Sequence, residues 1–94
     1  MTEKDVIKCI VRVSRKLMAR DLFCIYILVH PSVGKYIADT VNGIMVISDP
    51  MAPQDLIIGI TDLDFLNMAL EPEKISFEYF AHKLNTTGVA VCEI

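Results

Sequence analysis

The stretch FCIYILVHPSVGKYIADTVNG, Phe23 to Gly43, decides the fold of this chain. Its first part, Phe23 to Val29, is an apolar run of aromatic and β-branched residues, which predicts a strand covered on both faces. Pro31 lacks a backbone donor and cannot continue a central strand, so we expect the strand to stop near His30. Proline also suits the first turn of a helix, and a strand-to-helix corner is therefore predicted.

The second part of the stretch has the spacing of a helix. His30 or Ser32 could cap this helix at its start, and Asn42-Gly43 is a typical helix end. The apolar residues between these points that keep helical spacing are Val33, Tyr36, Ile37 and Val41. We therefore predict a helix that begins at the proline and ends at Asn42-Gly43.

Gly34-Lys35 invites comparison with a phosphate-binding loop. That motif needs an earlier glycine at the position where this chain has Val29. It also needs Ser or Thr after the lysine to hold magnesium, and here Tyr36 follows. We expect no phosphate binding, because Gly34 fits the first turn of the helix and Lys35 its solvent face.

The residues before the stretch predict another helix. Thr2 can cap it, and Asp5, three residues on, completes a pattern close to a capping box. Glu3 and Asp5 also lie at the positive end of the helix dipole. The apolar stripe consists of Val6, Ile7, Ile10, Val11, Val13, Leu17 and Met18.

The residues after the stretch predict mostly strands, while the segment 62–70 fits a short strand or a helical turn. The predicted strands are Ile44–Ser48, Asp55–Thr61, Ile75–His82 and Val89–Ile94. We therefore expect one α+β domain over residues 1–94. It would be a small two-layer domain, with two helices on one side of a mixed, largely antiparallel sheet of about five strands.

The composition limits the class of protein. A chain of 94 residues that is 53% apolar can form a core and leaves apolar surface for partners. Its three cysteines, Cys9, Cys24 and Cys92, are far apart in apolar surroundings, which predicts reduced thiols in a cytosolic protein. The polar N-terminus is not a signal peptide, and the longest apolar run, Leu22–Val29, is too short to span a membrane.

Charge is unevenly distributed along the chain. Residues 1–20 carry six basic and two acidic side chains, whereas the remainder carries three basic and ten acidic ones. The basic face of the first helix consists of Lys8, Arg12, Arg15, Lys16 and Arg20. This face could grip phosphates, but no aromatic residue interleaves with it, so we expect no nucleic acid partner. It is expected to be a solvated face, or to dock on the acidic surface of a neighbouring copy.

Candidate catalytic and metal-binding residues are few. Cys24 could approach His30 or His82 in a sheet, but Cys24 and His30 are six residues apart on one strand, too far for a hydrogen bond. Zinc ligands at short spacing are missing from the sequence. Acids that could hold a divalent cation are Asp62 and Asp64, with Asp49 or Asp55 as helpers. Such loop acids are usually solvated, so we expect no metal at these positions. Taken together, these observations predict no catalytic residue, metal or cofactor.

Four successive segments carry a family resemblance: VIKCIVRVSRKLMAR, FCIYILVHPSVGKYIAD, GIMVISDPMAPQDLIIGITDLDFLNMAL and KISFEYFAHKLNTTGVAVCEI. This succession resembles the C-terminal part of tailed-phage major capsid proteins of the Hong Kong phage type. In that family a helix precedes an apolar strand that ends in a helix-opening proline. Strands with a DP…P turn, an LIIG-like sequence and a GVAV-like sequence then follow.

The resemblance implies the axial domain of a capsid protein with the last strands of its peripheral domain. Its work would be non-catalytic self-assembly, packing against copies of itself or related coat-protein subunits, in the host cytoplasm and in the virion. The implied subunit contacts are Asp49, Pro50, Met51, Pro53, Asp62, Asp64 and Phe65. Family members also have an N-terminal arm, an extended loop and a spine helix. This sequence shows none of these three elements. We therefore expect an excised domain, a truncated relative, or a small protein that blocks capsid assembly.

Two other classes of function stay open at this point. The first is a small cytosolic regulatory or adaptor domain that dimerises through an exposed strand edge or binds a protein partner. The second is an enzyme that uses Cys24 or Cys92 with a histidine, or Asp62 and Asp64 with a metal. Neither alternative depends on the capsid resemblance.

Overall fold

The predicted N-terminal capping box begins helix α1 (Glu3–Met18) in the computed structural model, which describes residues 1–62, 66 and 75–94. The Thr2 hydroxyl accepts a hydrogen bond from the Asp5 amide at 3.2 Å, and the Asp5 carboxylate accepts one from the Thr2 amide at 2.9 Å. The helix buries one stripe of side chains, Val6, Cys9, Ile10, Val13 and Leu17. The predicted helix and its capping box are confirmed, but Val11 and Met18 of the predicted stripe are exposed.

The sheet has five strands in the order β2-β3-β1-β4-β5. The strands are β1 (Tyr26–Val29), β2 (Thr40–Val41), β3 (Ile44–Ser48), β4 (Leu56–Ile60) and β5 (Val89–Glu93). Strand β1 lies parallel to β3, whereas the pairs β1–β4, β2–β3 and β4–β5 are antiparallel. The sheet is thus mixed and largely antiparallel, and β2 and β5 form its two edges.

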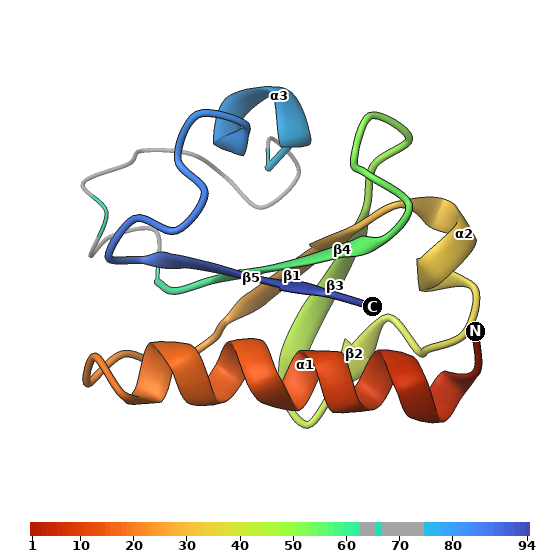
Figure 1. Ribbon diagram of the computed structural model, residues 1–94, viewed down its shortest axis with the longest axis horizontal. Coiled ribbons are helices and arrows are strands. Elements are labelled where there is room, and N and C mark those ends of the chain that lie inside the picture. Colours follow the sequence, from red (N-terminus) through yellow and green to blue (C-terminus); the bar gives the residue numbers. More distant parts are fainter. Residues whose placement is uncertain (63–65, 67–74) are drawn as a thin grey trace.

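Both faces of the sheet are covered (Figure 1). Alternate residues of β1 contribute to two hydrophobic clusters: Ile27 packs on the side of α1, and Leu28 packs on the side of helix α3 (Phe77–Phe80). Phe80 is fully buried in the second cluster. The α+β class is confirmed, and Val33 of the second helix (Pro31–Gly34) joins the cluster of α1, so the two predicted helices lie on one side of the sheet. Helix α3, on the opposite face, was not predicted.

The predicted second helix is shorter than expected. Helix α2 spans Pro31–Gly34, with His30 as its N-cap, and does not reach Asn42-Gly43. Asn42 and Gly43 have φ angles of 51° and 81° and form the turn of the β2–β3 hairpin, a typical use of Asn-Gly. The apolar spacing misled because Tyr36 and Ile37 pack on the core without being helical.

Ile75–His82 was predicted as a strand, and this prediction was wrong. The Ser76 hydroxyl accepts a hydrogen bond from the Tyr79 amide at 3.3 Å, which caps α3. Asp49, from the loop after β3, accepts a second hydrogen bond from the Phe77 amide at 2.7 Å. These two hydrogen bonds to the first turn of α3 therefore favour the helix over the strand that the alternating apolar pattern predicts.

The remaining strand predictions hold, with shifted ends. β1 begins at Tyr26, and Phe23, predicted to be buried, is 72% exposed. The ambiguous segment 62–70 lies mostly outside the described residues, which exclude 63–65 and 67–74. No helix in the described ranges has the length and apolar character needed to cross a bilayer.

Candidate protein-interaction groove

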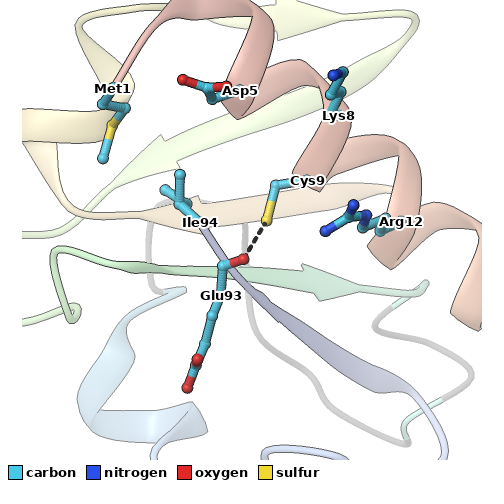
Figure 2. Close-up of a pocket in the computed structure, with 7 residues that line it drawn as sticks. All are labelled: Met1, Asp5, Lys8, Cys9, Arg12, Glu93 and Ile94. Carbon is cyan, nitrogen blue, oxygen red and sulfur yellow. Dashed lines mark hydrogen bonds between the residues drawn. The ribbon is translucent and has the colours of Figure 1, made fainter.

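A groove runs between helix α1 and the edge strand β5. Two adjoining hollows, which share Arg12 and Glu93, form it. We call it the α1–β5 groove; its defining residues are Lys8, Arg12, Arg15 and Lys16 of α1 and Val91 and Glu93 of β5. Figure 2 shows the end of this groove near the two chain termini. The basic face predicted from the sequence thus forms one wall of a groove.

Strand β5 supplies the other wall with backbone groups. The Thr61 amide donates to the Gly88 carbonyl at 3.0 Å, and the Ile94 amide donates to the Asp55 carbonyl at 2.8 Å. Hydrogen bonding alternates along an antiparallel pair, so residues 88, 90, 92 and 94 bond to β4. The residues whose amides and carbonyls point out of the sheet are therefore Val89, Val91 and Glu93.

Side chains of α1 cover two of the outward carbonyls. The Lys16 ammonium donates to the Val91 carbonyl at 2.6 Å, and the Cys9 thiol donates to the Glu93 carbonyl at 3.4 Å. Among the described residues, the outward amides of Val91 and Glu93 have no hydrogen-bond partner. The edge is thus covered at its acceptors and open at its donors.

Arg20 acts beyond the end of the groove. Its guanidinium donates to the Thr86 carbonyl at 2.8 Å and to the Thr87 carbonyl at 3.1 Å, in the turn before β5. Of the five predicted basic residues, Arg20 therefore stabilises the approach to β5 and does not line the groove.

The groove keeps its positive charge. Over residues 1–62, 66 and 75–94, none of its four basic side chains forms an ion pair with an acid. Glu93 extends its carboxylate away from α1 (Figure 2). Hydrogen bonds from the side chain and backbone of Thr2 hold the Asp5 carboxylate and lower its pKa. Arg12 and Arg15 are therefore available to an acidic partner, whereas Lys16 holds the Val91 carbonyl and the charge of Lys8 also lowers the pKa of Asp5.

Burial favours the protonated form of the Cys9 and Cys24 thiols. Burial, with a hydrogen bond to the Cys92 thiol, raises the pKa of Cys9 to about 12. Cys92 shares the Glu93 carbonyl with Cys9, at 3.5 Å. Burial also raises the pKa of Cys24 to about 11, and its thiol donates to the Tyr26 carbonyl at 3.4 Å. Neutral thiols are poor nucleophiles.

The structure does not join Cys24 to a histidine. His30 lies at the opposite end of β1, where its Nδ1 accepts a hydrogen bond from the Ser32 amide at 3.0 Å. His82 lies exposed just after α3. Of the two predicted caps for α2, His30 is the one used.

The first predicted contact loop is partly occupied by the chain itself. Asp49 is half-buried, and its carboxylate accepts hydrogen bonds from the Met51 amide at 2.9 Å and from the Phe77 amide at 2.7 Å. Pro50 and Met51 are exposed, and Pro53 is half-buried. Asp49 is therefore a structural residue, whereas Met51 is free to contact another molecule.

The second predicted contact loop lies at the other end of β4. Asp62 is exposed there, and Asp64 and Phe65 lie outside the described residues. Because β4 separates Asp62 from the first loop, Asp62 does not share a surface with Pro50 and Met51. Within the described part of the chain, no group of three His, Cys, Asp or Glu side chains could hold a metal ion.

An exposed apolar patch lies where α1 turns into β1. Met18 and Phe23 are 58% and 72% exposed, and shallow hollows connect Phe23 with Leu22 and Ile25. Asp21, with a φ angle of 60°, makes the turn, and Asp62 lies beside the patch. The sequence did not predict this patch, because Phe23 belongs to the apolar run that was predicted to be a buried strand.

Comparison with protein-family models, with curated proteins and with solved structures finds no match to this chain.

Proposed function

We propose that this chain is a non-catalytic protein-interaction domain, and that the α1–β5 groove docks an acidic region of a partner protein. One observation carries the proposal: four basic side chains without ion pairs among the described residues border an outward-facing strand edge. Charge complementarity of this kind speeds association and selects the partner.

Features of the thiols and histidine support a non-catalytic role. Cys9 and Cys24 are neutral thiols that donate to backbone carbonyls, and His30 is engaged as a helix cap. A nucleophilic cysteine would need a lowered pKa or an adjacent base. These groups therefore serve the fold.

The test combines crosslinking with reconstitution. A photoreactive benzoylphenylalanine replaces Arg15 in one variant and the exposed Lys35, outside the groove, in another; proteins captured only through position 15 are identified and purified. Calorimetry then compares the unmodified chain, Arg15→Glu and Lys35→Glu. We expect Arg15→Glu to weaken binding about tenfold or more, and Lys35→Glu to have little effect. Equal binding by both variants would contradict the proposal.

A second candidate is head-to-tail self-association, which the uneven charge along the sequence predicts; the capsid resemblance also implies packing between copies. The apolar patch at Met18 and Phe23, bordered by Asp21, supports it, because the basic groove of one copy complements this acidic rim on the next. Such heterologous contacts produce rings or filaments. Capsid-type assembly remains a proposal on this basis.

Light scattering over a range of concentrations tests the second candidate. The matched variants are Phe23→Ser and Met51→Ser, since both side chains are 72% exposed. If copies associate through the patch, Phe23→Ser lowers the oligomer mass and Met51→Ser does not. Added salt should also lower the mass, because it screens the charge contribution. A constant monomer mass would exclude this candidate.

A further inference from the structure

The outer edge of β5 has the geometry needed to receive another strand. Val91 and Glu93 each present an amide and a carbonyl outward, on alternate residues, as strand addition requires. Helix α1 runs beside this edge. From Lys8 to Ala19 it rises about 16 Å, the length of roughly five extended residues.

Lys16 blocks this edge in a reversible way. Its ammonium occupies the Val91 carbonyl, the acceptor that an added strand would need, at 2.6 Å. The side chain is exposed and long, so it can leave this carbonyl without disturbing the core. A carboxylate placed nearby offers the ammonium a stronger hydrogen bond, because both partners are then charged.

A second copy of β5 is a poor occupant of this edge. Antiparallel pairing of two β5 strands about a two-fold axis places the same sheet face of both copies on the same side. Their α1 helices would then lie next to each other across the axis, and Arg12 and Lys16 of one copy would face the same residues of the other. Like charges in this arrangement are repulsive.

The side chains around the edge specify the pattern of the occupant. One face of an added strand would lie along Lys8, Arg12 and Arg15, and the other would lie beside Val89 and Val91. Side chains alternate between faces along a strand. The matching segment therefore has acidic residues at every second position, with apolar, β-branched residues between them.

We propose that the α1–β5 groove accepts an extended segment of a partner protein as a sixth strand beside β5, and that this segment is acidic at every second residue. A carboxylate of the segment draws the Lys16 ammonium away from the Val91 carbonyl, which then accepts a backbone hydrogen bond from the segment. Lys16 thus keeps the edge closed to neutral or basic strands. This inference rests on the proposed function and adds the conformation and sequence pattern of the partner.

The probe is a fluorescein-labelled peptide of about eight residues that alternates Glu and Val. Two isomers carry N-methyl groups on alternate amides, one set on each edge of the extended peptide. Only one set of amides can face β5, so we expect one isomer to bind like the parent and the other to lose about tenfold or more in affinity. A peptide with Gln in place of Glu should also bind about tenfold more weakly.

The protein variants are Lys16→Met, which keeps the aliphatic stem, and Lys35→Met as the control outside the groove. Lys16→Met should bring the affinities for the Glu and Gln peptides closer together, whereas Lys35→Met should leave their ratio unchanged. In the unmodified chain, the peptide should slow hydrogen exchange at the Val91 and Glu93 amides.

Three outcomes would overturn the inference. Equal binding of both N-methyl isomers would mean that the contact is electrostatic and adds no strand. Equal or tighter binding of a short oligothymidylate would assign the groove to nucleic acid. No peptide binding at about 1 mM, the weakest range for specific contacts, would reject the acidic strand, while the crosslinking test could still uphold a folded acidic partner.

Discussion

The two edges of the sheet are protected by different means. At one edge, β2 has only two residues and turns sharply through Asn42-Gly43. At the other, β5 has five residues and is covered by the side chains of Lys16 and Cys9. Short edge strands and lysines at an edge are both known protections against unwanted strand pairing.

The difference is one of reversibility. The β2 edge is protected by its short length, which is fixed by the hairpin with β3. At the β5 edge, α1 side chains cover the carbonyls of Val91 and Glu93, and the Lys16 side chain can move away from its acceptor. One fixed and one removable protection would let this chain avoid aggregation and still bind a strand, as proposed above.

Alkaline pH should lower the free energy of unfolding more than any of the substitutions below. It acts on Cys9, whose thiol contacts β5. Cys9 has a pKa of about 12 in the folded chain and its ordinary value of 9.0 when unfolded. The raised folded pKa means that its stabilisation is complete below pH 9.0 and is lost as pH rises towards about 12. Urea denaturation followed by circular dichroism at increasing pH should show this loss.

Cys9→Ala is the control for the alkaline experiment, since lysines and tyrosines titrate in the same range. We expect a shallower fall in stability for this variant than for the unmodified chain. The same slope in both proteins would show that Cys9 is not the cause.

A cavity beneath α1, the helix whose side chains cover the β5 carbonyls, should have the next largest effect on stability. Val13 is fully buried and Val11 is 37% exposed on the same helix, so their alanine variants share the change in helix propensity. Val13→Ala should lower the free energy of unfolding by about 2–3 kcal/mol. Val11→Ala should change it by about 0.5 kcal/mol or less. Similar values for the two would mean that α1 is not anchored through Val13.

The fixed edge can be strained at Gly43. Alanine at its φ angle of 81° should destabilise the chain by about 1–2 kcal/mol, measured by urea denaturation. No heavy atom lies within 4 Å of a Cβ added at Gly43, so the backbone conformation is the cause of this effect. Asn42→Gly, at the preceding position, should be close to neutral. A neutral Gly43→Ala would indicate that the turn is not required.

The smallest expected effect concerns the turn before β5. Arg20→Ala removes two exposed hydrogen bonds to the carbonyls of Thr86 and Thr87 and should cost about 0.5–1 kcal/mol. Arg15→Ala, without such bonds, should have a smaller effect on stability. Thermal denaturation of both variants is sensitive enough to separate them, and equal melting temperatures would assign Arg20 no role at this edge.

Local patterns predicted the elements whose partners are close in sequence. The stripe of α1 and its capping box, together with β3, β4 and β5, follow from spacing and residue type alone. The errors at Asn42-Gly43 and at Ile75–His82 have a different origin. Asn-Gly suits both a helix end and a hairpin turn, and only the pairing of β2 with β3 decides between them.

One of the two walls of the α1–β5 groove could be predicted from the sequence. The basic face of α1 follows from the spacing of its lysine and arginines, because it belongs to a single helix. Its neighbour β5 does not, since the strand at an edge depends on the order of the whole sheet. The same holds for α3, whose second cap comes from Asp49, far away in the sequence.

Asp49 also has a consequence for the opening of the native state. Its carboxylate joins the loop after β3 to the first turn of α3, and a helix of four residues does not persist in water without such tertiary contacts. The segment that carries α3 should therefore open as a cooperative unit at a lower free energy than the α1 side. Asp49→Asn should lower this free energy of opening further. In hydrogen exchange, the amides around Phe80 should then exchange with solvent long before those of α1.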